Sequence, residues 1–157
     1  MARKQYGRRA TTIICLKLVE THDSRKKRVK KLKAERASLY GKINSLNITD
    51  MPTSHGGDAG DPIFNLYAKM EELEEAINAE QHRIQIVDDA IENIGKNIEK
   101  DAEVRRQMQK GILTNIQLGG CEVPFYYTNY PEQYSKDMFY AHRKAFLREI
   151  ADKLYLS

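Results

Sequence analysis

The sequence predicts an all-α fold, in which an antiparallel helical hairpin or coiled coil is followed by a C-terminal helix-turn-helix-like unit. Three observations support this prediction. Charged residues make up 31% of the 157 residues, a proportion typical of long solvated helices and too high for a compact β or α/β core. Apolar residues recur at heptad spacing over two long stretches. Two stretches rich in Gly and Pro interrupt that spacing and separate the helical segments.

These interruptions define three predicted regions. Residues 1–23 form a basic N-terminal arm, residues 24–117 a helical hairpin, and residues 118–157 the C-terminal unit. The hairpin is interrupted at 47–62 by "NITDMPTSHGGDAGDP", which has no apolar periodicity. A connection of this length is uncommon inside a compact domain, so we expect a flexible loop there.

The first predicted helix covers about 24–46, with Asp23 or Ser24 as its N-cap. Arg36 occupies one heptad core position of this helix. The other core positions are apolar: Val29, Leu32, Leu39, Ile43 and Leu46.

The second predicted helix begins at Pro62, after Asp61 as its N-cap. It keeps the heptad register to Ile94, and only Glu80 interrupts the apolar series. Gly95 then fits the left-handed residue that closes a helix. The apolar core positions are Ile63, Leu66, Met70, Leu73, Ile77, Ile84, Val87, Ile91 and Ile94.

A third helix is expected over about 98–117, with apolar positions Ile98, Val104, Met108, Ile112 and Ile116. The first helix is shorter and basic, and the second is longer and acidic. Two such helices joined by a loop pair most simply as an antiparallel hairpin, although the same heptads also allow a homodimer.

The net charge of +4 conceals a strong asymmetry. Residues 1–36 contain 13 basic and 3 acidic residues, whereas residues 50–107 contain 6 basic and 14 acidic residues. A basic segment of this kind fits an anionic partner, and it fits equally well a basic helix folded against an acidic one. For the run at 25–33, "RKKRVKKLK", we favour pairing within the chain over DNA.

The C-terminal stretch "YSKDMFYAHRKAFLREIADKL" predicts a closing helix capped by Ser135. Lys144, Arg148 and Asp152 share one helical face. The opposite face is apolar and carries Phe139, Phe146, Leu147, Ile150 and Leu154. A recognition helix has this design, because it docks by its apolar stripe and points its first turns at DNA. An ordinary amphipathic helix with solvated charges has it as well.

This stretch, preceded by "VPFYY", resembles the closing helix-turn-helix of small phage late-gene regulators of the RinA and ArpU type. The C-terminal part of those proteins is similar to region 4 of sigma factors. The order of parts upstream is also similar, since a basic heptad helix, the glycine-rich segment and the acidic helix "LYAKMEELEEAI" follow one another. The resemblance covers about 24–157, and its weight rests on this order rather than on one motif.

The resemblance implies a set of residues at a DNA surface: Ser135, Lys136, Tyr140, Arg143, Lys144 and Arg148. Arg143 projects close to the apolar stripe, where it packs as readily as it binds. Additional phosphate contacts are open to the N-terminal arm, where ordinary solvated charge is the competing explanation: Arg3, Lys4, Arg8 and Arg9.

The sequence departs from that family at the first helix of the helix-turn-helix. The family has an acidic and apolar helix there, whereas this chain has "VPFYYTNYPEQYS" with Pro124 and Pro131. Proline disfavours a helix interior. We therefore expect the supporting helix to be short, or irregular and packed through its tyrosines.

The sequence offers no catalytic or metal constellation. Its four histidines have no metal-ligand spacing, Cys15 and Cys121 form no pair pattern, and "HGGDAGD" lacks the Lys-Ser/Thr of a phosphate loop. We expect no enzyme activity, no metal and no cofactor. No apolar run approaches the roughly 20 residues that span a bilayer, and no secretion signal is evident, so we expect a cytoplasmic protein of a bacterial host cell.

Two functional hypotheses follow. The first is a sequence-specific regulator of phage or prophage transcription, which binds double-stranded DNA and contacts host RNA polymerase. The second is a non-catalytic coiled-coil interaction protein, such as a phage adaptor or an inhibitor of a host protein.

Overall fold

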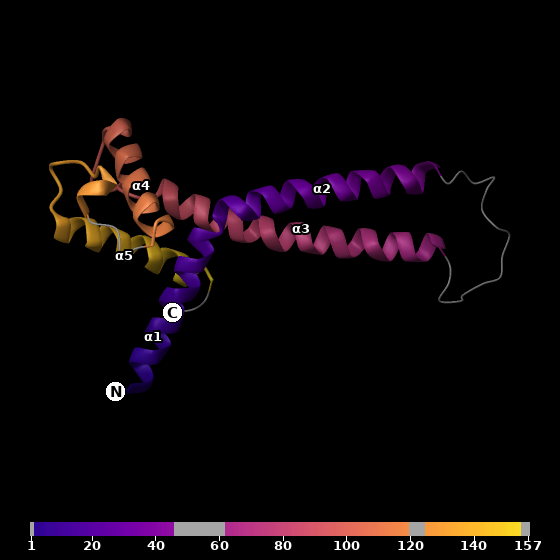
Figure 1. Ribbon diagram of the computed structural model, residues 1–157, viewed down its shortest axis with the longest axis horizontal. Coiled ribbons are helices and arrows are strands. Elements are labelled where there is room, and N and C mark those ends of the chain that lie inside the picture. The colour runs from indigo at the N-terminus through magenta and orange to yellow at the C-terminus, as the bar shows by residue number, and fades with distance from the viewer. Residues whose placement is uncertain (1, 46–61, 120–124, 155–157) are drawn as a thin grey trace. The chain divides into compact units, whose positions relative to one another are not determined.

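The computed structural model describes residues 2–45, 62–119 and 125–154, without the side chains of residues 2–8 and Tyr127. The regular elements of the described residues are helices, without a strand, which confirms the all-α prediction (Figure 1). The helices are α1 (Ala2–Glu20), α2 (His22–Ser45), α3 (Pro62–Glu92), α4 (Ala102–Gln117), the short 3-10 helix η3 (Phe125–Thr128) and α5 (Lys136–Lys153). None of the helices in the described ranges is long and apolar enough to cross a membrane.

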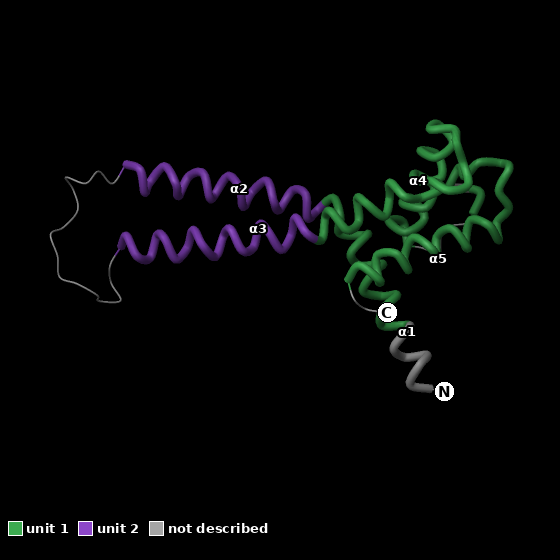
Figure 2. Tube along the Cα trace, turned by 180° about the vertical axis from the view of Figure 1, so that it is seen from behind, with its two compact units in different colours: residues 1–23, 83–157 green, residues 24–82 purple. Residues whose placement is uncertain are grey.

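The chain forms two compact units that differ from the predicted regions. Unit 1 combines residues 1–23 with residues 83–157, and unit 2 consists of residues 24–82 (Figure 2). The predicted hairpin therefore extends only to residue 82 rather than to residue 117. The reason is that α4 packs against α1 and η3 and belongs to unit 1.

Unit 2 is the antiparallel hairpin formed by α2 and α3 (Figure 1). Its buried apolar residues are heptad core positions of the two helices: Val29, Leu39, Leu73 and Ile77. Asp23 and Ser24 lie in the first turn of α2 instead of capping it, because the helix already begins at His22. Asp61, Leu46 and most of the expected loop 47–62 lie outside the described residues.

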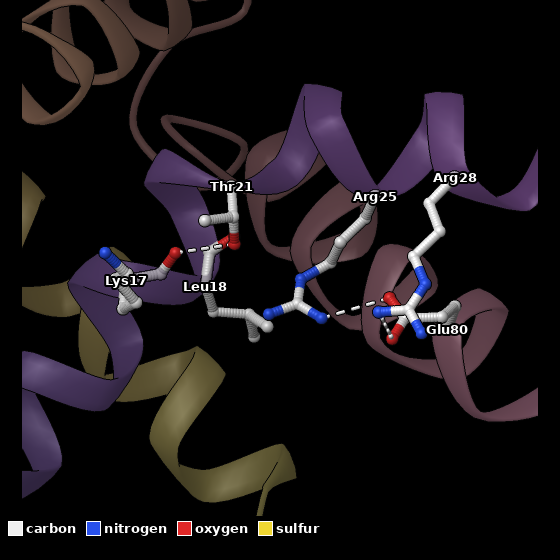
Figure 3. Close-up of polar contacts among 6 residues, drawn as sticks. All are labelled: Lys17, Leu18, Thr21, Arg25, Arg28 and Glu80. Carbon is white, nitrogen blue, oxygen red and sulfur yellow. Dashed lines mark hydrogen bonds and ion pairs between the residues drawn. The ribbon is translucent and has the colours of Figure 1, made fainter. Parts of the chain in front are cut away.

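Glu80 is the polar residue at a core position of α3, and it is 5% exposed. Arg25 Nη1 donates a hydrogen bond to Glu80 Oε2 at 3.0 Å, and Arg28 Nη1 lies 3.8 Å from Glu80 Oε1 (Figure 3). A carboxylate buried between two helices costs desolvation energy unless it is paired and hydrogen-bonded. Pairing of basic residues in α2 with the acidic helix, as the charge pattern predicts, therefore occurs at Arg25 and Arg28.

Unit 1 has a larger core, which α1, the end of α3, α4 and α5 build together. We expected residues 1–23 to form a basic arm, but Ala2–Glu20 is helical. Cys15, Leu18 and Val19 are buried in the core. The apolar run "TTIICLKLV" supplies this buried face. The predicted arm was based on the basic residues of the segment and did not include this apolar face. Thr21 closes α1 by donating its Oγ1 hydrogen to the carbonyl of Lys17 at 2.7 Å (Figure 3).

The connection between α3 and α4 is longer than predicted. Gly95 has φ +73°, as expected of a residue that closes a helix, but α4 begins at Ala102 rather than near Ile98. Asp101 caps α4, since its side chain accepts a hydrogen bond from Glu103 N. Ile98, which we expected to be a core position, is 55% exposed in the turn.

Candidate nucleic-acid interface

The candidate site is the exposed face of α5, and the opposite face of this helix anchors it in unit 1. Ser135 caps α5 as predicted, with its Oγ accepting a hydrogen bond from Met138 N at 3.2 Å. Leu154 is half-buried against the same core. The other residues predicted for the apolar stripe are buried: Phe139, Phe146, Leu147 and Ile150. Full burial of one such side chain contributes about 1.5–3 kcal/mol, so α5 is firmly held.

An aromatic cluster supports the N-terminal half of α5. The Phe139 ring lies 4.9 Å from that of Tyr130 and 5.2 Å from that of Phe125, centroid to centroid. Tyr134 stacks edge-on against His142 at 5.4 Å. The supporting rings come from η3 (Phe125) and from the turn before α5 (Tyr130 and Tyr134). The supporting element is thus short and packed through tyrosines, as the prolines of this segment predict, and Pro124 itself lies outside the described residues.

A partly buried hydrogen bond joins this cluster to α5. Tyr130 Oη lies 2.6 Å from His142 Nδ1. Burial lowers the pKa of His142, which favours the neutral imidazole. Burial also raises the pKa of Tyr130, and the neighbouring Tyr134 adds to that rise. A protonated phenol therefore donates to a neutral imidazole nitrogen.

Glu99 ties the turn before α4 to the turn before α5. One carboxylate oxygen accepts from Asp101 N at 3.2 Å, and the other accepts from Tyr134 Oη at 3.0 Å and Gln133 Nε2 at 3.2 Å. The Asp101 amide, followed by the Tyr134 hydroxyl, lowers the pKa of Glu99. Burial and the bond to Glu99 raise the pKa of Tyr134. Periodicity could not have located Glu99, because its partners lie 34 and 35 residues away.

The solvent-facing side of α5 carries two of the predicted cations one turn apart. Lys144 and Arg148 are both exposed, and they line a shallow depression of the surface. The short side chains of Ala141 and Ala145 also line it. Two acidic residues complete the lining: Glu149 and Asp152.

The other predicted DNA-contacting residues of the C-terminal unit differ in their exposure. Lys136 is exposed in the first turn of α5, next to the Ser135 cap. Tyr140 is half-buried, with its ring 5.1 Å from that of Phe139. Arg143 is also half-buried, and among the described residues nothing hydrogen-bonds to its buried Nε. Tyr140 and Arg143 thus lie at the edge of the exposed face.

The residues predicted to make secondary phosphate contacts belong to α1. Arg9 is exposed on this helix. Arg3, Lys4 and Arg8 fall within the helical range, but their side chains lie outside the description. The N-terminal cations therefore sit on a helix rather than on an extended arm.

The C-terminal end of α5 carries two ion pairs, one at i,i+4 spacing and one to α3 that local spacing does not indicate. Lys153 Nζ lies 3.7 Å from Asp89 Oδ2 and 3.6 Å from Glu149 Oε1. Asn93 Nδ2 also donates to Glu149. These contacts involve Glu149 and Lys153 and leave residues 136–148 as the cationic part of the helix.

Among the described residues, no cluster of three His, Cys, Asp or Glu side chains is arranged to hold a metal ion. The buried thiol of Cys15 has a pKa raised by burial, which disfavours a reactive thiolate. Cys121 lies outside the described residues.

Comparison of the chain with models of protein families, with curated proteins and with solved structures gives no match.

Proposed function

We propose that this chain is a non-catalytic, sequence-specific DNA-binding regulator of phage or prophage genes, which contacts duplex DNA through residues 136–148 of α5. The observation that carries the proposal is the pair Lys144 and Arg148, exposed together on a helix whose other face is anchored in a core. Lysine and arginine side chains provide most protein contacts to DNA phosphates, and arginine also reads guanine.

The N-terminal end of α5 adds to this surface. Lys136 and the first-turn amides lie together there, and the helix dipole favours an anion at that end. Ala141 and Ala145 allow a close approach of the helix to a groove. Glu149 and Asp152 repel phosphates, which confines contact to the N-terminal part.

The helix-turn-helix arrangement is part of the proposal. The element directly before α5 is a four-residue 3-10 helix, so α5 is supported by an aromatic cluster instead of a regular first helix. We further propose that the protein acts in the cytoplasm of a bacterial host, with host RNA polymerase as a second partner and as a homodimer. The resemblance to the RinA and ArpU type of regulator supports the bacterial host and the polymerase contact, and the heptad spacing of α2 and α3 allows the homodimer.

Salt-dependent binding to bulk duplex DNA tests the proposal. The logarithm of the binding constant should fall by about 0.9 per neutralised phosphate for each tenfold rise in salt. The double variant Lys144→Ala/Arg148→Ala should bind more weakly and with a flatter salt slope. Its free energy of unfolding should stay within about 0.5 kcal/mol of the wild type, since both side chains are exposed.

A matched control removes the same charge elsewhere. Lys27 and Lys31 are exposed on α2 in unit 2, so Lys27→Ala/Lys31→Ala also lowers the net charge by two. We expect this variant to keep most of the affinity and slope. If the α2 variant loses binding while the α5 variant keeps it, the basic face of α2 is the DNA surface and our assignment is wrong.

The alternative function is a coiled-coil interaction protein, which the hairpin of unit 2 favours. Such a protein would show no steep salt-dependent affinity for DNA. The same titration therefore separates the two functions.

A further inference from the structure

Three aromatic side chains are exposed at the hairpin tip, by which we mean the end formed by the last turns of α2 and the first turns of α3. Tyr40 is 56% exposed, Phe64 67% and Tyr67 57%. The antiparallel course of the two helices brings them to the same end of unit 2 (Figure 2). Clustered exposed aromatic residues mark interaction surfaces.

The heptad register places these residues on one side of the hairpin. Leu39 of α2 is buried, Leu66 of α3 is half-buried, and both occupy the d position of the heptad. Tyr40 and Tyr67 directly follow them and therefore both occupy the e position. In helices that run in opposite directions, residues at this equivalent position flank the shared core on the same side. Phe64 precedes Tyr67 by three residues and shares its helical face. The three rings therefore belong to one surface.

Charged residues continue this surface along the hairpin. Lys33 precedes Tyr40 by seven residues, and Lys30 lies three residues further back on the same face of α2. On α3, Glu71 and Glu74 follow Phe64 and Tyr67 by seven residues each. All four charged side chains are exposed. Within the described ranges none of the four takes part in an ion pair.

This face, which we call the tip face, has three parts: an aromatic end (Tyr40, Phe64, Tyr67), a basic edge on α2 (Lys30, Lys33) and an acidic edge on α3 (Glu71, Glu74). The full lengths of the two helices in unit 2 show the same separation of basic and acidic charge. Residues 24–45 contain nine basic residues and one acidic residue, whereas residues 62–82 contain one basic and five acidic residues. A surface with opposite charges on its two edges is complementary to itself after a suitable rotation.

We infer that the tip face binds the tip face of a second copy of this chain. A two-fold axis along the hairpin sets α2 of one copy against α3 of the other, so Lys30 and Lys33 face the glutamates of the partner. The same rotation keeps both tips at one end, where the aromatic side chains of the two copies meet. The product is a four-helix arrangement with an apolar end and two rows of unlike charges.

The charge pattern selects this orientation and this occupant. A two-fold axis across the hairpin would set α2 against α2, with lysines opposite lysines, and would separate the aromatic ends. A nucleic acid on the tip face would meet Glu71 and Glu74 beside the rings, and phosphates repel carboxylates. The inference stands apart from DNA binding by α5, because it concerns other residues in the other unit.

Sedimentation of the full chain without DNA tests the inference through two charge-reversed variants. Lys30→Glu/Lys33→Glu makes both edges acidic, and Glu71→Lys/Glu74→Lys makes both basic. Each variant alone should dimerise about tenfold more weakly than the wild type or worse, since like charges then face each other. An equimolar mixture should regain the dimer, because an all-acidic face meets an all-basic one. Charge effects within a single hairpin cannot produce this recovery.

Two further variants complete the experiment. Phe64→Ala/Tyr67→Ala removes apolar contact and should weaken the dimer with helical circular dichroism retained. Lys27→Glu/Lys31→Glu reverses two exposed charges of α2 outside the tip face and should leave dimerisation unchanged. A wild-type chain that sediments as a monomer at every concentration overturns the inference. So does a dimer that both charge-reversed variants retain, and neither result bears on DNA binding.

Discussion

The two units bury their apolar residues in different ways. Unit 2 is a two-helix hairpin, and its buried residues follow the heptad of each helix, with Glu80 among them. Unit 1 assembles residues from four helices that are far apart in the sequence, and sixteen buried residues form its core. The hairpin is therefore specified by local periodicity and by the pairing of Glu80 with Arg25 and Arg28, whereas unit 1 depends on packing between distant segments.

This difference predicts unequal costs for the same substitution. Ile112 in unit 1 is 0% exposed and Ile77 in unit 2 is 1% exposed. Ile112→Ala should cost about 4 kcal/mol, near the upper part of the range for such cavities, because neighbours from several helices enclose it. Ile77→Ala should cost about 2–3 kcal/mol, since two helices can close on the gap. Urea denaturation of each variant measures this, with the exposed Ile98→Ala as control. Equal costs at Ile112 and Ile77 would contradict the comparison.

The ion pair gives the next largest effect. Glu80→Ala leaves the partly buried Arg25 without its 3.0 Å acceptor, and we expect a loss of about 2–3 kcal/mol in the free energy of unfolding. The exposed Glu75→Ala on the same helix should change it by less than about 0.5 kcal/mol. Thermal melting followed by circular dichroism compares the two. Equal melting temperatures would show that the ion pair adds no stability to the hairpin.

Replacing two glycines by alanine should change the free energy of unfolding in opposite directions. Gly95→Ala places a Cβ 2.9 Å from Met108 Sδ at φ +73°, so it should destabilise unit 1 by about 1–2 kcal/mol. Gly41 lies within α2, and a Cβ there meets nothing within 4 Å, so Gly41→Ala should stabilise the hairpin by about 0.5–1 kcal/mol. Denaturant titration should give opposite shifts. Shifts in the same direction would contradict either the left-handed conformation of Gly95 or the open helical position of Gly41.

The smallest expected effect is pH dependence in unit 1. The pKa of His142 is lowered in the folded chain, so the unfolded chain binds more protons as the pH falls through the ordinary histidine range near 6.5. Unit 1 should therefore lose stability as the pH falls through that range towards the lowered pKa. His142→Gln keeps an acceptor for Tyr130 without titrating there. Unfolding at pH 7.5 and 5.5 should show a smaller pH difference in the variant, and an identical difference would exclude His142 as the source.

Sequence periodicity predicted the parts of the fold that local spacing controls. The all-α class and the Ser135 cap are confirmed, as is the burial of Phe139, Phe146, Leu147 and Ile150. Each of these features depends on residues within one or two helical turns.

The missed features depend on distant contacts. The burial of Cys15, Leu18 and Val19 requires α4 and α5, which no spacing in the first 23 residues indicates. The start of α4 was misplaced because Ile98 continues the heptad register by sequence but lies in a turn that Gly95 opens. Within the candidate site, spacing separated Lys144 and Arg148 from the buried stripe. It could not reveal the bond between Tyr130 and His142 that helps to hold that helix.

Selection of bound duplexes from a random pool tests the central claim, that the cationic face of α5 reads double-stranded DNA. The account predicts enrichment of a common sequence motif by the wild-type chain and loss of that motif with Lys144→Ala/Arg148→Ala. A pool that stays random after repeated selection with folded protein would contradict it, as would a motif that the double variant selects equally well.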